Sequence, residues 1–176
     1  MLDYINEIPV YMDEHRGRGD YLRLRSDFDA SGAGSLTVIA SGSSNNATNC
    51  ARYGMRDGLD KEIFIHTPYT FVNCEKIDRN SFYIVISQSG RSKNTLNVVR
   101  MLKEAGVTVH FITDNGELSE DEHMKVYHLD VGNEEVPFVT KGMSATVFFL
   151  LRFAGVVFPD NVSETFSEYQ KMAEDH

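Results

Sequence analysis

The chain has 176 residues, of which 41 % are hydrophobic, and this suits one compact domain with a sizeable core. Its formal net charge of −9 argues against a nucleic-acid partner, which would require a basic face. The longest apolar runs, such as Phe148–Leu151, are far too short to span a bilayer, so we expect no membrane partner.

Helical sequence dominates the first part of the chain. We expect residues 1–30 to form an N-terminal helical segment with a break near Pro9, because proline interrupts the hydrogen-bond ladder of a helix. The turn Ser31–Gly34 that follows has the glycines of a dinucleotide fingerprint. It precedes a strand instead of following one, so it is weak support for a nucleotide site.

Five short apolar segments then alternate with helical stretches. They are Leu36–Ala40, Ile63–Ile65, Phe82–Ile86, Val107–Ile112 and Val126–Leu129. Continuous apolar runs are expected of strands buried on both faces, and strand–helix alternation favours a parallel sheet with helices on both sides. We therefore predict an α/β fold with a doubly wound, five-stranded parallel sheet. Such sheets bind ligands beyond the carboxyl ends of the strands, where the strand order reverses.

The helices between and after these strands carry apolar faces that predict their packing. The faces consist of Ala47, Cys50, Ala51, Gly54 and Met55 after the first strand, and of Thr95, Val98, Val99 and Leu102 after the third. The small residues of the first face would let that helix lie close to the sheet. The helix from Thr140 to Ala154 is apolar almost all round, which predicts burial on all sides. We expect a second copy or a second domain to cover it; the alternative is a helix wedged between the sheet and the N-terminal helices.

Two polar loops follow the first and third strands, and each leads into a helix. The first is Ser41–Asn46 and the second is Ser87–Ser92. Both offer hydroxyl groups, a glycine that permits close backbone approach, and the unpaired N–H groups of a helix N-terminus. These donors suit an oxyanion such as phosphate, and the amides and other hydroxyls suit a polyol. The plain alternative is that the serines only cap their helices, although capping needs one oxygen per helix.

No other catalytic motif competes with these loops. The sequence has no Gly-x-Ser-x-Gly elbow, no phosphate-loop Gly-Lys-Ser pair and no Cys-x-x-Cys. Asp114 ends the fourth strand, where an acid is more often a turn residue, and we interpret His66, His110 and His128 as structural. Two cysteines and the lack of a signal-peptide pattern favour a cytoplasmic protein, and we expect no metal or other cofactor.

The chain resembles the sugar isomerase (SIS) domain family over nearly its whole length. Ser41–Ser44 is similar to the family's first sugar-phosphate loop, and Ser87–Thr95 is similar to its signature, usually Ser-Gln-Ser-Gly-Glu-Thr. Glu134 followed by Thr140–Lys141 resembles the family's Glu…Ser-Thr-Lys segment. Ile5–Pro9 resembles the opening of one branch, which contains the isomerase half of glucosamine-6-phosphate synthase and the fructosamine-6-phosphate deglycases. The likeness is strongest to the N-terminal SIS domain of that branch.

The resemblance implies a flavodoxin-like three-layer sandwich with the SIS domain at residues 31–158. Residues 159–176 would form a C-terminal helix that leads to a second SIS domain or contacts another subunit. The implied ligand is a phosphorylated sugar with its phosphate over the second loop. The implied substrate-binding residues are Gly42, Ser43, Ser44, Ser87, Gln88, Ser89, Ser92 and Lys141.

Two positions depart from the family pattern. Arg91 replaces the usual Glu, and Val139 replaces the Ser before Thr-Lys. A cation in the first turn of a helix is unfavourable, but Arg91 would strengthen phosphate binding if it faced the ligand; pointing into solvent is the alternative. The same branch takes its acid–base Glu, ring-opening His and C-terminal Lys from a second SIS domain. No matching segment is found here, so a homo-oligomer or a second SIS domain would complete the site.

The resemblance leaves two functions open. One is a sugar-phosphate aldose–ketose isomerase or fructosamine-6-phosphate deglycase acting on a hexose 6-phosphate derivative, with Glu134 as its catalytic proton-transfer or positioning group. The other is a non-catalytic phosphosugar sensor. For Glu134 the alternative role is a helix cap, and for Lys141 it is a contact with a carboxylate instead of the ligand.

Overall fold

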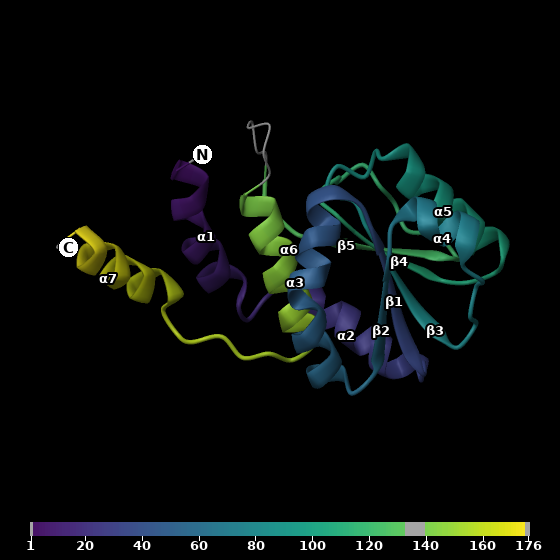
Figure 1. Cartoon of the computed structure of the whole chain (residues 1–176), viewed down its shortest axis with the longest axis horizontal. Helices are drawn as coiled ribbons and strands as arrows, with labels where there is room; N and C mark the ends of the chain where they lie inside the picture. The colour runs from purple at the N-terminus through teal and green to yellow at the C-terminus, as the bar shows by residue number, and fades with distance from the viewer. Residues whose placement is uncertain (1, 133–139, 175–176) are drawn as a thin grey trace.

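The central sheet has five parallel strands in the order β2-β1-β3-β4-β5, in a computed structural model that describes residues 2–132 and 140–174 (Figure 1). The strands are β1 (Ser35–Ala40), β2 (Glu62–His66), β3 (Ser81–Ile86), β4 (Val109–Thr113) and β5 (Met124–His128). This is the strand order of flavodoxin-like sheets, so the predicted fold class is confirmed. The order reverses between β1 and β3, which pair directly with each other.

Helices cover both faces of the sheet and form a three-layer sandwich (Figure 1). One face carries α4 (Pro68–Cys74) and α5 (Lys93–Glu104); the other carries α2 (Asp20–Ser31), α3 (Gly42–Leu59) and α6 (Lys141–Phe153). Outside this layer, α1 (Leu2–His15) packs against α6, and α7 (Val162–Glu174) packs against α1. Within the described residues, no helix is long and apolar enough to cross a membrane.

Strand β3 illustrates why the sheet is buried on both sides. Ile84 and Ile86 enter the core beneath α2, α3 and α6, whereas Tyr83 and Val85 enter the core beneath α4 and α5. Successive side chains of a strand point to opposite faces, so a strand in this position needs apolar residues at every step. Burying each large aliphatic side chain contributes about 1.5–3 kcal/mol.

Helix α6 lies among α1, α2 and α3, so its all-round apolar surface is explained within this chain. Its closest neighbour is α3, where two glycines allow the approach. A Cβ atom added at Gly58 would lie 2.1 Å from the carbonyl oxygen of Ala154, and one at Gly54 would lie 2.4 Å from Leu151. The small residues of α3 therefore admit α6 as well as the sheet. A second copy covering α6 stays a prediction.

One residue of the predicted α3 face is wrong. Cys50 is exposed, whereas Ala47, Ala51 and Met55 are fully buried. The buried residues follow a four-residue repeat that Leu59 continues. Cys50 precedes Ala51 by one residue and so lies about 100° away around the helix, on the solvent side.

The predicted break near Pro9 is also wrong. Helix α1 runs through Pro9 without interruption, and the chain leaves helical conformation only after His15. Tertiary packing holds this helix together: Pro9 and Tyr11 are buried, and the Tyr11 hydroxyl donates a hydrogen bond to the Leu129 carbonyl. The division of the chain into residues 1–30, 31–158 and 159–176 stays a prediction.

Candidate functional site

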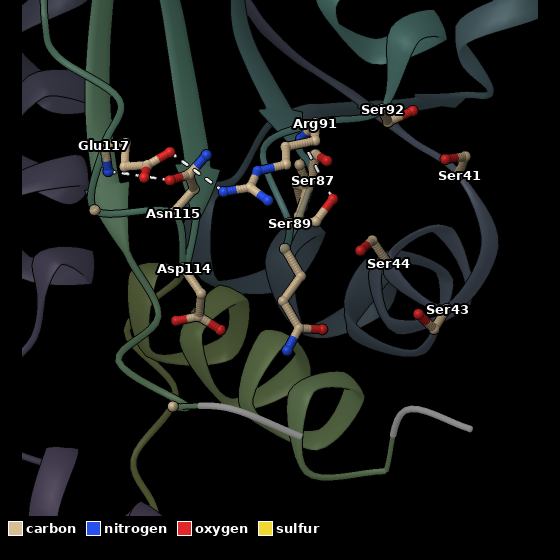
Figure 2. A pocket seen from close by; sticks show the side chains of 14 residues that line it. Ser41, Ser43, Ser44, Ser87, Ser89, Arg91, Ser92, Asp114, Asn115 and Glu117 are labelled. Atoms are coloured by element: carbon tan, nitrogen blue, oxygen red, sulfur yellow. Dashed lines mark hydrogen bonds and ion pairs between the residues drawn. The ribbon is translucent and has the colours of Figure 1, made fainter. Parts of the chain in front are cut away.

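A cavity of about 770 Å³ opens beyond the carboxyl ends of β1, β3 and β4 (Figure 2). It brings both serine loops together at the point where the strand order reverses, as the sequence predicts. A third loop, after β4, joins them. The lining residues are Ser41, Ser43, Ser44, Ile86, Ser87, Gln88, Ser89, Arg91, Ser92, Asp114, Asn115, Gly116, Glu117 and Gly132.

The first loop turns sharply from β1 into α3. Ser41 is extended, with φ of −131°, and Gly42 then adopts φ of +56°. That left-handed conformation favours glycine and aims the first turn of α3 at the cavity. Ser43 and Ser44 line the cavity, whereas Gly42 shapes the turn and is not itself among the lining residues.

The second loop is held rigidly against β4. The amide of Ser87 donates to the carbonyl of Ile112, and the carbonyl of Gln88 accepts from the amide of Asp114 at 2.9 Å. At Gly90, φ is +62° and an added Cβ atom would come within 2.8–3.0 Å of neighbouring side chains, so only glycine fits. The loop is therefore positioned before any ligand arrives.

The serines at the two helix starts do not serve as caps. Ser41 and Ser92 occupy the N-cap positions of α3 and α5, yet neither side chain makes a cap hydrogen bond. By contrast, Thr67 at the start of α4 caps its helix by accepting from the amide of Thr70 at 3.2 Å. The capping-only alternative lacks the contact that it requires.

Both helix N-termini add donors at this edge of the sheet. The first amides of α3 and α5 have no carbonyl one turn earlier to bond, and the helix dipole places partial positive charge there. Together with the serine hydroxyls, they form a concentration of neutral donors suited to an oxyanion. A protein with a net charge of −9 can bind an anion with such local donors.

Asp114 supplies a carboxyl group to the same cavity, although the sequence suggested only a turn residue. Its Oδ1 accepts a hydrogen bond from the amide of Val131 at 3.1 Å. Its Oδ2 is buried and has no hydrogen-bond partner among the described residues. Burial raises the pKa of this carboxyl above its usual value, and the Val131 amide and the nearby Gln88 side chain only partly oppose the rise. The carboxyl-end rule for parallel sheets could have identified Asp114, because it follows a strand directly.

Arg91 lines the cavity and forms an ion pair with Glu117. The guanidinium Nη2 lies 3.2 Å from Glu117 Oε2, and the two side chains are 74 % and 80 % exposed. A pair as exposed as this contributes little to stability, about 0–1 kcal/mol. Arg91 thus stands at the rim with its charge directed along the cavity wall (Figure 2).

The remaining predicted residues lie elsewhere. Lys141 Nζ donates to Glu7 Oε2 at 2.6 Å, and Lys141 is not among the residues that line the cavity. Its predicted contact with a ligand stays a prediction, and the observed partner is a carboxylate of α1. Glu134 and Val139 lie outside the described residues.

The SIS domain family model matches residues 31–154 of the chain. The chain therefore belongs to the SIS domain family, as its two serine loops and strand order indicate. No curated protein matches the sequence.

Solved structures share the fold at low sequence identity. A predicted phosphosugar isomerase of Clostridium difficile 630 superposes with a TM-score of 0.71 at 18 % identity, over 95 % of this chain and 50 % of that one. For the C-terminal domain of glucosamine-fructose-6-phosphate aminotransferase from Francisella tularensis the TM-score is 0.70, at 17 % identity over 97 % and 53 %. E. coli CFT073 protein c3406, solved in complex with a phosphosugar, gives 0.67 at 18 % identity over 97 % and 89 %. The chain thus spans about half the length of the first two structures.

Proposed function

We propose that the cavity binds a phosphorylated sugar, with the phosphate over the second serine loop and the N-terminus of α5. The observation that carries this proposal is the convergence of two serine loops on one cavity, with N-cap hydroxyls that leave their own helices uncapped. Membership of the SIS domain family supports it, as does a structural relative solved with a phosphosugar bound.

The chemistry divides between the phosphate and the sugar. Helix amides and serine hydroxyls hold the phosphate, and Gln88 and the remaining hydroxyls bind the sugar hydroxyl groups. The phosphate then acts as a handle that fixes the sugar carbons at one place in the cavity. Rigid support of the second loop by β4 reduces the cost of ordering it on binding.

For activity we propose a sugar-phosphate aldose–ketose isomerase or a fructosamine-6-phosphate deglycase, in the cytoplasm. Such a reaction moves a proton at the carbons remote from the phosphate and needs a base within reach of them. Glu134 is the candidate for this role. A second SIS domain or a second copy would supply the rest of the site, which agrees with the double length of some structural relatives. A monomeric mass in light scattering at micromolar concentration would contradict the second copy.

A non-catalytic sensor is the competing function, because both functions require phosphosugar binding and only the enzyme requires turnover. Exchange of solvent deuterium into C1 or C2 of fructose 6-phosphate, followed by NMR, separates them. Exchange at a rate proportional to protein concentration supports the enzyme. Binding without exchange supports the sensor.

Calorimetric titration with fructose 6-phosphate tests the binding site itself. Replacing Ser87 and Ser89 together by alanine should weaken binding by about 2–4 kcal/mol, or roughly 30- to 1,000-fold, because each lost hydrogen bond to a charged group costs about 1–2 kcal/mol. Ser167→Ala is the matched control, since that hydroxyl bonds within α7 at 2.9 Å. Equal affinity of the double variant and the control would contradict the proposed site.

A further inference from the structure

The cavity has two ends of opposite chemical character. At one end lie the serine hydroxyls and the starts of α3 and α5, which donate hydrogen bonds. At the other lies the carboxyl group of Asp114. Figure 2 shows Asp114 well apart from Ser41 and Ser92, with the side chains of the second loop between them. A ligand that spans the cavity therefore meets donors at one end and an acceptor at the other.

The Asp114 carboxyl group is undersatisfied for its degree of burial. A carboxylate offers about four lone-pair sites, and the amide of Val131 fills one of them. Its covered Oδ2 finds no donor among the described residues. Leaving a buried acceptor without a partner is unfavourable, and more so for a charged one. The terminal torsion of aspartate is broad, so the carboxyl group can turn to meet a donor that enters the cavity.

Charge around Asp114 is uncompensated as well. Asp130 lies near enough to raise the pKa of Asp114 further, in addition to the larger effect of burial. Among the described residues that line the cavity, Arg91 carries the cationic side chain, and it is paired with Glu117. The acidic end of the cavity therefore lacks a positive charge that the protein's own lining could supply.

We propose that the ligand of this cavity is an amine-bearing sugar phosphate, with its ammonium group against Asp114 and its phosphate over the serine loops. This inference rests on the proposed phosphosugar site and specifies the class of sugar. The amine is on C1 or C2 of the sugar, at the end remote from the phosphate. Asp114 is then a specificity-determining residue, and the ligand's two charges match the two ends of the cavity.

An ammonium group fits Asp114 better than a sugar hydroxyl for two reasons. A hydroxyl would donate one hydrogen bond but leave the negative charge unbalanced. An ammonium group donates up to three hydrogen bonds and cancels that charge, and such charge-assisted bonds are about twice as strong as neutral ones. Buried carboxylates are stabilised most by a cation in direct contact.

Two matched pairs of ligands test the proposal by calorimetry at neutral pH with the 176-residue chain. Glucosamine 6-phosphate is compared with glucose 6-phosphate, and fructosamine 6-phosphate with fructose 6-phosphate, so that each pair differs only by an amine in place of a hydroxyl. In at least one pair, the amine ligand should bind about tenfold more tightly, since one charge-assisted contact of this kind is worth about 1.4 kcal/mol or more. Asp114→Asn should reduce that preference to less than about threefold while keeping affinity for the neutral sugar within about threefold.

Two control variants separate this proposal from the proposed function. Glu117→Gln, which changes the other acid of the lining, should keep the amine preference, and Ser89→Ala should weaken both members of a pair equally. If all four sugars bind and neither pair shows a preference, the amine is wrong and the phosphosugar site stands. If Asp114→Asn weakens both members of a pair equally, Asp114 binds a hydroxyl and the proposal is likewise overturned. If none of the four binds, both proposals fail.

Discussion

Two partly buried carboxyl groups in this protein have opposite surroundings. Asp27 on α2 accepts hydrogen bonds from Lys125 Nζ at 2.6 Å and from the Tyr127 hydroxyl at 2.5 Å. Burial alone would raise the pKa of Asp27, but these two bonds outweigh it and hold the pKa below its usual value. At Asp114, burial prevails and the pKa is raised. The first carboxyl is completed by the fold, and the second is left for something else to complete.

The surroundings of Asp27 extend this contrast to a whole cluster. His110 Nδ1 lies 2.9 Å from the Tyr127 hydroxyl, and the His110 ring stacks on Phe82 with ring centroids 3.8 Å apart. None of these residues lines the cavity. The comparison teaches that polar groups satisfied by one another support the fold, whereas polar groups that share a cavity without partners indicate a ligand site.

The largest effect expected from the satisfied cluster is acid sensitivity. Burial lowers the pKa of His110 to about 3, from 6.5 in its ordinary state. Below pH 6.5 the unfolded chain binds a proton at this residue while the folded chain does not, so protonation favours unfolding and stability falls as the pH falls. Between about pH 6.5 and about pH 4.5 the free energy of unfolding should drop by about 2 kcal/mol from this residue alone. Asp27 acts only at lower pH, because its pKa is lowered.

Urea titrations at several pH values measure this slope. His110→Asn is the matched variant, since its amide can still donate to Tyr127 but does not titrate. The variant should be less stable at neutral pH, and its stability should change less over the same acid range. Parallel curves for the two proteins would show that His110 titrates normally and that the cluster is open to water.

Removing one hydroxyl from the cluster should have a somewhat smaller effect. The single Tyr127 proton goes to Asp27, so His110 must donate to Tyr127 through Nδ1–H. Tyr127→Phe leaves that donor buried without a partner and should lower the free energy of unfolding by about 1–2 kcal/mol. Phosphosugar affinity should stay within about twofold, the reverse of the pattern expected for the serine variants. A loss of affinity without loss of stability would contradict the separation of the two clusters.

The fold was largely readable from the sequence because each strand lies between two helical layers. Continuous apolar runs such as Phe82–Ile86 leave few alternatives to a buried parallel strand, and the carboxyl-end rule then places the two serine loops together. The path of α1 was not readable, since propensity disfavours Pro9 and only the packing of α1 on α6 overrides it.

The site was readable in its repeated part and not in its single residues. Two serine loops at equivalent strand ends form a pattern, so Ser43, Ser44, Ser87 and Ser89 were found. Asp114 gives no pattern, because an acid after a strand is usual in turns and its importance depends on burial. Lys141 illustrates the converse: its partner Glu7 is 134 positions away, and nothing local indicates that contact.

The smallest effect expected concerns a third carboxyl, Asp13, which joins α1 to the start of α7. It accepts from the amides of Val162 and Ser163 at 2.8 and 2.9 Å and from the Ser163 hydroxyl at 2.5 Å. These bonds, led by the Ser163 hydroxyl, lower the pKa of Asp13. Asp13 therefore caps α7 from another helix, and Asp13→Ala should cost about 1 kcal/mol, the usual value of a cap.

Hydrogen exchange locates this loss. In Asp13→Ala, amides of residues 163–174 should exchange about fivefold faster, because α7 opens locally, while the sheet and phosphosugar affinity stay unchanged. Glu14→Ala, an exposed neighbour on α1, is the control and should leave α7 protected. Unchanged exchange in Asp13→Ala would mean that apolar packing alone holds α7. The contrast with Asp114 then becomes one of sign: replacing a satisfied carboxyl costs stability, whereas Asp114→Asn removes an unbalanced charge and should leave stability equal or higher.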